Sequence, residues 1–146
     1  MTSKPRYVFD TNVVVSALLF SQGKPAQALE IALEQGELLV SEEIVRELND
    51  VLSREKFEPY AGEADRARFL QALLQEARLV ETREVIRACR DAKDDKYLEV
   101  AVSGDAQCIV SGDEDLLLLH PFRGIAILKP GDFLERLVGE EPIQFR

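Results

Sequence analysis

A chain of 146 residues, 46% of them hydrophobic and 31% charged, is long enough for one domain with a sizeable core and short for two. The formal net charge of −9 argues against nonspecific nucleic-acid binding over the whole surface, because such binding needs a positive field facing the phosphates. The longest apolar run, at 13–20, is too short to cross a bilayer, and no cationic leader precedes it. We therefore expect a cytoplasmic protein with no membrane contact, a single domain over 1–146 with its core at about 6–138 and a C-terminal tail at 139–146.

The first half of the chain alternates apolar runs with helical patterns. "RYVFD" (6–10) predicts a strand, and the apolar "NVVVSALLF" follows it. A helix is expected from Pro25 to about Gln35, where Gly36 ends it, and then a strand at 37–41. Ser41 is a suitable N-cap for a helix at 42–52, whose apolar residues follow the 3.6-residue period.

The second half continues the alternation. A helix is expected at 64–76, a weaker strand at 77–81 and a helix at about 94–104. The fourth strand lies in "QCIVSGD" (107–113), a short helical turn in "EDLLLL", the fifth strand in "IAIL" and a last helix at 129–139. Apolar strands separated by helices are typical of an α/β protein with a mostly parallel sheet. Cys89, Cys108 and a single histidine support neither a disulfide framework nor a zinc site.

Acidic residues fall where such a sheet binds ligands, at the carboxyl ends of its strands. Asp10 closes the first strand, and Asp113 follows the fourth. The helix at 94–104 begins at the same edge, because a crossover helix runs antiparallel to the strands. At 100° per residue, Asp94 shares the buried face with Leu98 and Ala101, whereas Asp95 turns toward the flank.

Glu47 lies at the margin of the apolar stripe of the helix at 42–52, with its side chain directed toward the helix start. Asp10, Glu47, Asp94 and Asp113 are thus expected around one pocket. Carboxylates in contact repel one another by several kcal/mol at about 4 Å, and a hard divalent ion, Mg²⁺ or Mn²⁺, relieves that repulsion. The pocket then fits metal-assisted phosphodiester hydrolysis, with Asn12 placed to orient Asp10 or the attacking water.

Each acid also has a simpler interpretation. Asp10 at a strand end is also typical of an Asx-turn residue, Asp94 and Asp113 are suitable helix caps, and Glu47 resembles a solvated surface charge. Lys96 and its neighbour Lys93 either meet phosphate oxygens or belong to a solvated helix start. His120 lies away from the expected edge and is interpreted as structural.

Four motifs together resemble the PIN-domain family, in particular its branch of toxin components of toxin-antitoxin systems, the VapC-like ribonucleases. They are "FDTN", the acid within "SEEIVREL", "DAKDDKYLEVA" and "IVSGDEDLL", and the resemblance covers about residues 6–135. It implies a five-stranded parallel sheet of order 3-2-1-4-5 flanked by helices on both faces, and Mg²⁺- or Mn²⁺-dependent endoribonuclease activity. It assigns catalysis and metal binding to Asp10, Glu47, Asp94 and Asp113. Supporting roles fall to Asn12, Ser111, Asp91 and Asp115.

The resemblance also implies an RNA substrate, a homodimer and a small antitoxin protein with a basic tail. Two alternatives remain open. One is a phosphoacceptor receiver domain, which shares a doubly wound sheet, an acidic pocket and a Lys-Pro pair such as Lys129–Pro130, although "ARLVETRE" offers no phosphoacceptor aspartate at the third strand. The other is a catalytically silent PIN-fold binding domain.

Overall fold

The computed structural model describes residues 4–144, and the side chains of residues 4–137. Its centre is a five-stranded, all-parallel sheet in the order β3-β2-β1-β4-β5, which confirms the expected order. The strands are β1 (Arg6–Phe9), β2 (Glu37–Val40), β3 (Arg78–Leu79), β4 (Cys108–Val110) and β5 (Ala126–Leu128). A receiver domain has the order 2-1-3-4-5, so the sheet excludes that alternative.

Seven α-helices and two 3₁₀ turns are described between and after the strands. They are α1 (Thr11–Leu19), α2 (Lys24–Gln35), α3 (Glu42–Leu52), η1 (Glu55–Phe57), α4 (Glu63–Glu76), η2 (Ala92–Asp94), α5 (Asp95–Ser103), α6 (Glu114–Leu117) and α7 (Pro130–Gln144). The apolar run after β1 is helical although it is rich in valine, because Val13, Val14 and Val15 are all buried. Burial of a helix around most of its circumference outweighs the modest helix propensity of valine.

Several boundaries differ from expectation; the third strand, expected at 77–81, is limited to Arg78–Leu79. The helix expected at 94–104 starts with η2, so Asp94 lies at a junction between a 3₁₀ turn and an α-helix. The last helix continues beyond the expected 139 to Gln144, so it includes most of the expected tail at 139–146; residues 145–146 lie outside the described part.

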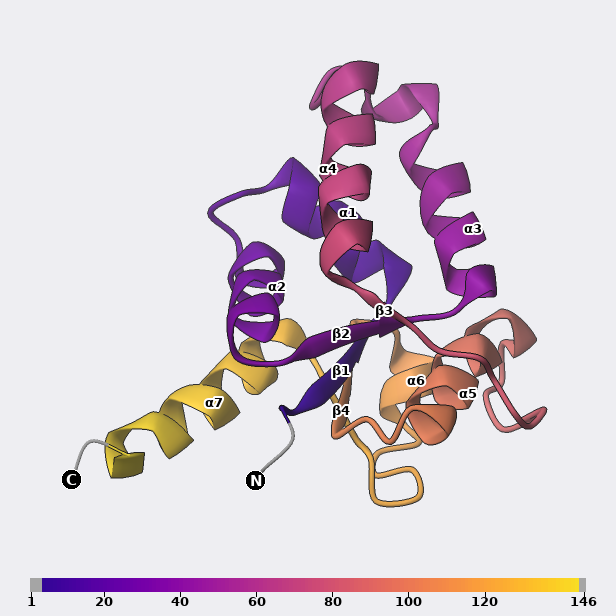
Figure 1. Cartoon of the computed structure of the whole chain (residues 1–146), viewed down its shortest axis with the longest axis vertical. Helices are drawn as coiled ribbons and strands as arrows, with labels where there is room; N and C mark the ends of the chain where they lie inside the picture. Colours follow the sequence, from indigo (N-terminus) through magenta and orange to yellow (C-terminus); the bar gives the residue numbers. More distant parts are fainter. Residues whose placement is uncertain (1–3, 145–146) are drawn as a thin grey trace.

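The connections place helices on both faces of the sheet (Figure 1). From β1 through β2 to β3 the chain moves in one direction across the sheet, and from β3 through β4 to β5 it moves in the other. Because such crossovers are right-handed, α1 and α2 lie on one face and α5 on the other. α2 also contacts α7, and α5 contacts β1, β2 and β4. β1 and β4 are parallel neighbours at the centre of the sheet, and the connections that follow them run toward opposite edges of the sheet. This is the switch point at which open parallel sheets bind ligands.

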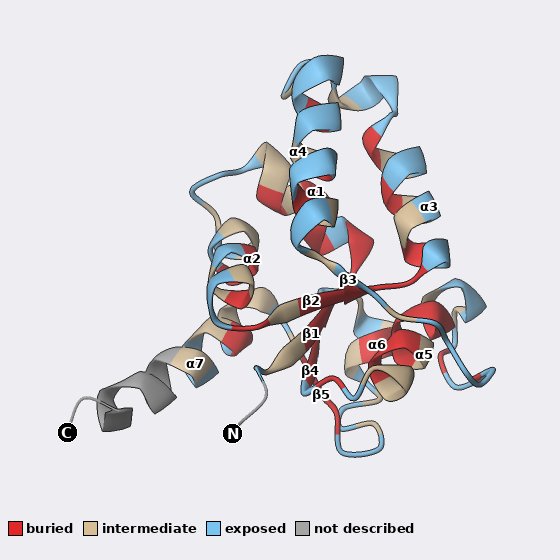
Figure 2. Cartoon of the chain, viewed as in Figure 1, coloured by how far each residue is buried: buried red, intermediate tan, exposed pale blue. Residues whose placement is uncertain are grey.

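The central strands form the core, as the buried residues of β1, β2 and β4 in Figure 2 show. On the side of α7, Phe133 packs edge-on against the rings of Tyr7 and Phe9, with ring centroids 5.0 and 5.9 Å apart. Gly36 joins α2 to β2 where a Cβ would lie 2.3 Å from the carbonyl oxygen of Pro5. Within residues 4–144, no helix has the length and apolar character needed to span a membrane.

Candidate acidic site at the carboxyl edge of the sheet

The four expected acids come from four different elements and meet at the β1–β4 switch point. Asp10 follows β1, Asp113 follows β4 closely, Asp94 ends η2 and Glu47 lies in α3. Asp10 is 4% exposed, and burial together with the negative charges of Asp113 and Glu47 raises its pKa. Burial, with the negative charges of Asp113 and Asp10, raises the pKa of Asp94. The structure therefore brings the expected residues together, and their environments are different.

Asp10 is fixed on both carboxylate oxygens. Oδ2 accepts a 2.7 Å hydrogen bond from the Ser111 hydroxyl, and Oδ1 accepts one of 3.1 Å from the backbone N–H of Asn12 as the cap of α1. Asn12 thus orients Asp10 through its backbone N–H and not through its side-chain amide. Burial, with the charges of Asp113 and Glu47, raises the pKa of Asp10 despite these hydrogen bonds.

Ser111 also connects Asp10 to Asp113. Its hydroxyl oxygen, fully buried, accepts a 3.0 Å hydrogen bond from the backbone N–H of Asp113. Asp113 in turn caps α6 by accepting a 3.1 Å bond from the N–H of Asp115. The Asx-turn interpretation of Asp10 and the capping interpretation of Asp113 are therefore correct, and both carboxylates still face the acidic site.

Asp94 has a different environment. Its side chain does not cap α5, which removes the capping interpretation for this residue. Instead it forms a side-chain hydrogen bond with Asp113. Partial burial, that hydrogen bond and the charges of Asp113, Asp10 and Asp91 raise the pKa of Asp94 to about 7. Because a second carboxylate lies against it, ionisation of Asp94 is disfavoured, and a substantial fraction of Asp94 is protonated at neutral pH.

Glu47 is held by neutral donors and by a cation. Its Oε1 accepts hydrogen bonds from the Thr11 hydroxyl, at 2.6 Å, and from the Tyr97 hydroxyl. Its Oε2 lies 3.0 Å from the Lys96 ammonium. Burial alone would raise the pKa of Glu47, but the bonds from Thr11, Tyr97 and Lys96 outweigh burial and lower it. Glu47 is therefore a fully ionised carboxylate with its charge compensated inside the protein.

Sequence reasoning missed three of these partners. Thr11 and Tyr97 are buried, and the N–H of Thr11 also donates to the Tyr97 hydroxyl oxygen at 3.1 Å. Burial, the charge of Asp10 and the bond to Glu47 raise the pKa of Tyr97, which therefore stays a neutral donor. Lys96 is only 6% exposed although it lies about 200° around the helix from Asp94. No periodicity could have found Lys96, because its partner belongs to α3, which packs against α5.

The other aspartates of "CRDAKDDKYLEVAV" have distinct roles. Asp91 caps η2 by accepting a 3.0 Å hydrogen bond from the N–H of Lys93. Asp95 was expected on the flank of the helix, away from the buried face of Asp94. It is nevertheless only 7% exposed, and its Oδ1 accepts bonds from the N–H groups of Ala88 and Cys89 at 3.2 and 2.8 Å. Asp95 is buried because the loop before η2 folds back over this flank.

Two further residues lie near the site or were candidates for it. Asp115 Oδ1 lies 3.7 Å from the exposed Arg90 guanidinium, so one basic side chain borders the acidic edge. His120 accepts a 2.9 Å hydrogen bond from the N–H of Ile127 on Nδ1, in keeping with the structural role expected for it.

The donor set fits a hard divalent ion. In the part of the chain with described side chains, no three acidic, imidazole or thiol groups already converge at a spacing that could hold a metal. Mg²⁺, however, commonly uses one or two protein carboxylates and retains waters. Asp94 and Asp113 supply such a pair with Asp10 beside them, and among the described residues no basic side chain forms an ion pair with any of these three.

A groove of about 610 Å³ leads away from Asp10 and Asp113 between α1 and the starts of α2 and α7. Its other lining residues are Asn12, Val13, Ser16, Pro25, Gly112 and Pro130. This groove gives an extended ligand access to the carboxylates.

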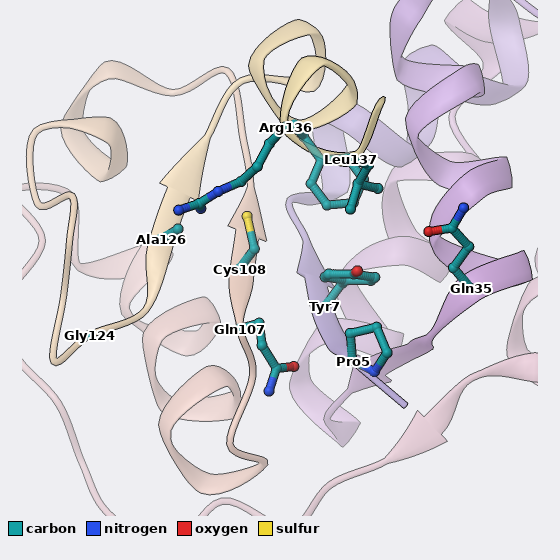
Figure 3. A pocket seen from close by; sticks show the side chains of 10 residues that line it. Pro5, Tyr7, Gln35, Gln107, Cys108, Gly124, Ala126, Arg136 and Leu137 are labelled. Atoms are coloured by element: carbon teal, nitrogen blue, oxygen red, sulfur yellow. The ribbon is translucent and has the colours of Figure 1, made fainter. Parts of the chain in front are cut away.

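A second cavity, of about 710 Å³, lies at the opposite, amino-terminal end of the strands, between β1, β4, β5 and α7 (Figure 3). It is larger, but no acid lines it. Burial raises the pKa of its one thiol, Cys108, to about 12, although Arg136 opposes this, so the thiol is no nucleophile at neutral pH. We therefore place the functional site at the acidic edge.

Comparisons with known proteins show the family of this chain. The chain is 30% identical over 119 residues to an uncharacterized protein of Methanocaldococcus jannaschii, MJ1680, covering 80% of this chain and 76% of that protein. Its fold resembles the crystal structure of PAE2754 from Pyrobaculum aerophilum, with a TM-score of 0.62, 19% identity and coverage of 93% and 91% of the two chains. It also resembles VapBC2 from Rickettsia felis bound to a DNA fragment from their promoter, with a TM-score of 0.57, 14% identity and coverage of 84% and 96%. A family model described as the PIN domain matches residues 6–115, so the chain belongs to the PIN-domain family.

Proposed function

We propose that this protein is a Mg²⁺- or Mn²⁺-dependent endoribonuclease that hydrolyses phosphodiester bonds in single-stranded or structured RNA. PIN domains are generally nucleases that use divalent ions. The observation that carries the proposal is the contact between Asp94 and Asp113 beside the buried Asp10, because this group of carboxylates lacks a compensating cation. A divalent ion would supply the missing positive charge, and it would attract the phosphate group of the RNA substrate.

The residues of the chain divide the work. Asp94 and Asp113 would hold the ion, and Ser111 and the Asn12 N–H keep Asp10 oriented beside them. When bound, the ion polarises the phosphate and lowers the pKa of a water molecule. The groove beside Asp10 is open enough to admit an extended strand, and Asn12 and Ser16 present polar groups along it.

Cleavage of single-stranded RNA by the purified protein tests this proposal. We expect Mg²⁺ or Mn²⁺ to support cleavage and EDTA to stop it. Asp10→Asn and Asp94→Asn should each lower the rate by more than about 100-fold, the scale of loss for groups that hold a catalytic metal. Asp65→Asn, which removes the same charge from an exposed residue of α4, is the matched control.

Undiminished cleavage by both site variants would exclude this mechanism. Folded, metal-binding protein without cleavage would favour the silent PIN-fold binding domain. Cleavage of a DNA strand of the same sequence at an equal rate would contradict the RNA assignment.

We further propose that the enzyme is the toxin of a toxin-antitoxin pair and forms a homodimer. The structural neighbour VapBC2 is a complex, and an acidic pocket is the complement of a basic antitoxin tail. Two exposed aromatic residues at the end of α1 and before α4, Phe20 and Tyr60, contact each other with ring centroids 6.2 Å apart, a surface of the kind that binds proteins.

The partner proposal is tested by coexpression with any short adjacent reading frame that encodes a DNA-binding fold with a basic tail. Its product should copurify and suppress cleavage, and failure of both would leave a solitary nuclease. Light scattering of the purified chain tests the dimer, and a mass of 16.4 kDa at all concentrations would exclude it.

A further inference from the structure

Lys96 lies inside the acidic site with almost no access to solvent. The side chain is 6% exposed, and its ammonium lies 3.0 Å from Glu47 Oε2. The same ammonium donates to the backbone carbonyl of Lys93 and lies 4.9 Å from the centroid of the Tyr97 ring. Three separate contacts therefore hold a buried cation against one of the four carboxylates.

Glu47 has little capacity left for a metal ion. An ionised carboxylate offers about four lone-pair sites. Thr11 and Tyr97 use two of them on Oε1, and Lys96 uses one on Oε2. An ion bound directly by Glu47 would have to displace the lysine, which would leave a buried ammonium unpaired.

The opposite side of the site has no such compensation. No basic side chain pairs with Asp10, Asp94 or Asp113 among the described residues, whose ion pairs at this edge are Lys96–Glu47 and Arg90–Asp115. The negative charge that attracts a cation is thus concentrated at the three aspartates.

We propose that Lys96 occupies the place of a second cation, so that this PIN domain binds a single divalent ion at its three aspartates and leaves Glu47 paired with the lysine. The inference rests on the metal dependence proposed above. It makes Lys96 a positioning residue, which fixes both the carboxylate of Glu47 and the number of ions in the site.

The wild-type chain gives the first test, without RNA. Titration with Mn²⁺, followed by electron paramagnetic resonance and calorimetry, should give one ion per chain. Anomalous scattering from a Mn²⁺-soaked crystal should place it at the aspartates, with the Lys96–Glu47 contact intact. Two ions, or one ion coordinated by Glu47, would overturn the inference and leave the nuclease proposal standing, whereas no bound ion would overturn both.

Substitution of the lysine gives the second test. Lys96→Met keeps much of the side-chain volume and frees Glu47, so the stoichiometry should rise from one ion to two. Adding Glu47→Gln to this variant should restore one ion. Lys93→Met, at an exposed lysine of the same segment, is the matched control and should still bind one.

Thermal unfolding must show that these variants fold before their stoichiometry is compared. A folded Lys96→Met protein that still binds one ion would overturn the inference. If that variant does not fold, Lys96→Arg, which keeps the charge, should bind one ion, and the position of the ion in the wild-type crystal decides the question.

Discussion

The two halves of the acidic site differ in how their charge is balanced. Glu47 receives two hydroxyl donors and an ammonium, and its pKa lies below the ordinary value. Asp94 has another carboxylate, Asp113, as its neighbour, and the pKa of Asp94 rises to about 7. Residues of the same chemical type, a short distance apart, are thus prepared for different tasks. The charge of Glu47 is compensated by other groups of the protein, whereas among the described residues no basic side chain pairs with Asp94 or Asp113.

The largest expected effect comes from removing the ion pair between Lys96 and Glu47, the half of the site whose charge is balanced. Glu47→Gln leaves the buried Lys96 ammonium without a counter-charge, and we expect a loss of about 3 kcal/mol in the free energy of unfolding. Urea unfolding in EDTA measures it. Glu43→Gln, which removes an exposed carboxylate from the same helix, should change the free energy by less than about 0.5 kcal/mol. Equal stability of the two variants would show that the Lys96–Glu47 pair does not anchor the site.

The second prediction concerns the pH dependence of metal binding by the unbalanced half. Asp94 must lose its proton to hold an ion, so the association constant for Mn²⁺ should fall about tenfold per pH unit below pH 7 and level off above it. Glu47, with its lowered pKa, should contribute no step between pH 5.5 and 8. Calorimetry across this range tests the contrast, and a constant affinity would contradict it.

The third prediction is a gain of stability without metal. The pKa of Asp94 is raised in the folded state, so its stabilising contribution is complete below the unfolded pKa of about 4 and is lost as the pH rises through about 7. Above pH 7, Asp94→Asn should therefore raise the melting temperature in EDTA by about 3 °C, or about 1 kcal/mol after allowance for solvent screening. The same change should weaken stabilisation by Mn²⁺.

Calorimetric melting at pH 8 and pH 4 measures this effect, and the gain should shrink at the lower pH. A lower melting temperature for Asp94→Asn at pH 8 would indicate a structural role for the carboxylate in place of repulsion.

The smallest effect is expected just outside the site. Asp91→Ala removes the cap of η2 and should lower the free energy of unfolding by about 0.5–1 kcal/mol. Because Asp91 is not held against the other acids by a hydrogen bond, the number of bound Mn²⁺ ions should stay at one. Loss of metal binding in this variant would show that Asp91 also belongs to the group of acids that holds the ion.

The sequence by itself determined the frame of the site. A polar residue after each buried strand and the 3.6-residue period of α3 located Asp10, Asp113 and Glu47, because strand ends and helix faces follow from local pattern. Helix geometry also separated Asp94 from Asp95, although it did not predict that Asp95 is buried. The resemblance to PIN domains supplied the strand order.

Only the tertiary structure decided which carboxylates are balanced. Asp95 is buried because the loop before η2 covers it, and Lys96 is buried because α3 packs against α5. Local periodicity describes one element at a time, whereas the charge state of a group depends on donors and charges that other elements bring to it. The positions of the acids were therefore readable from the chain, and the difference between Glu47 and Asp94 was not.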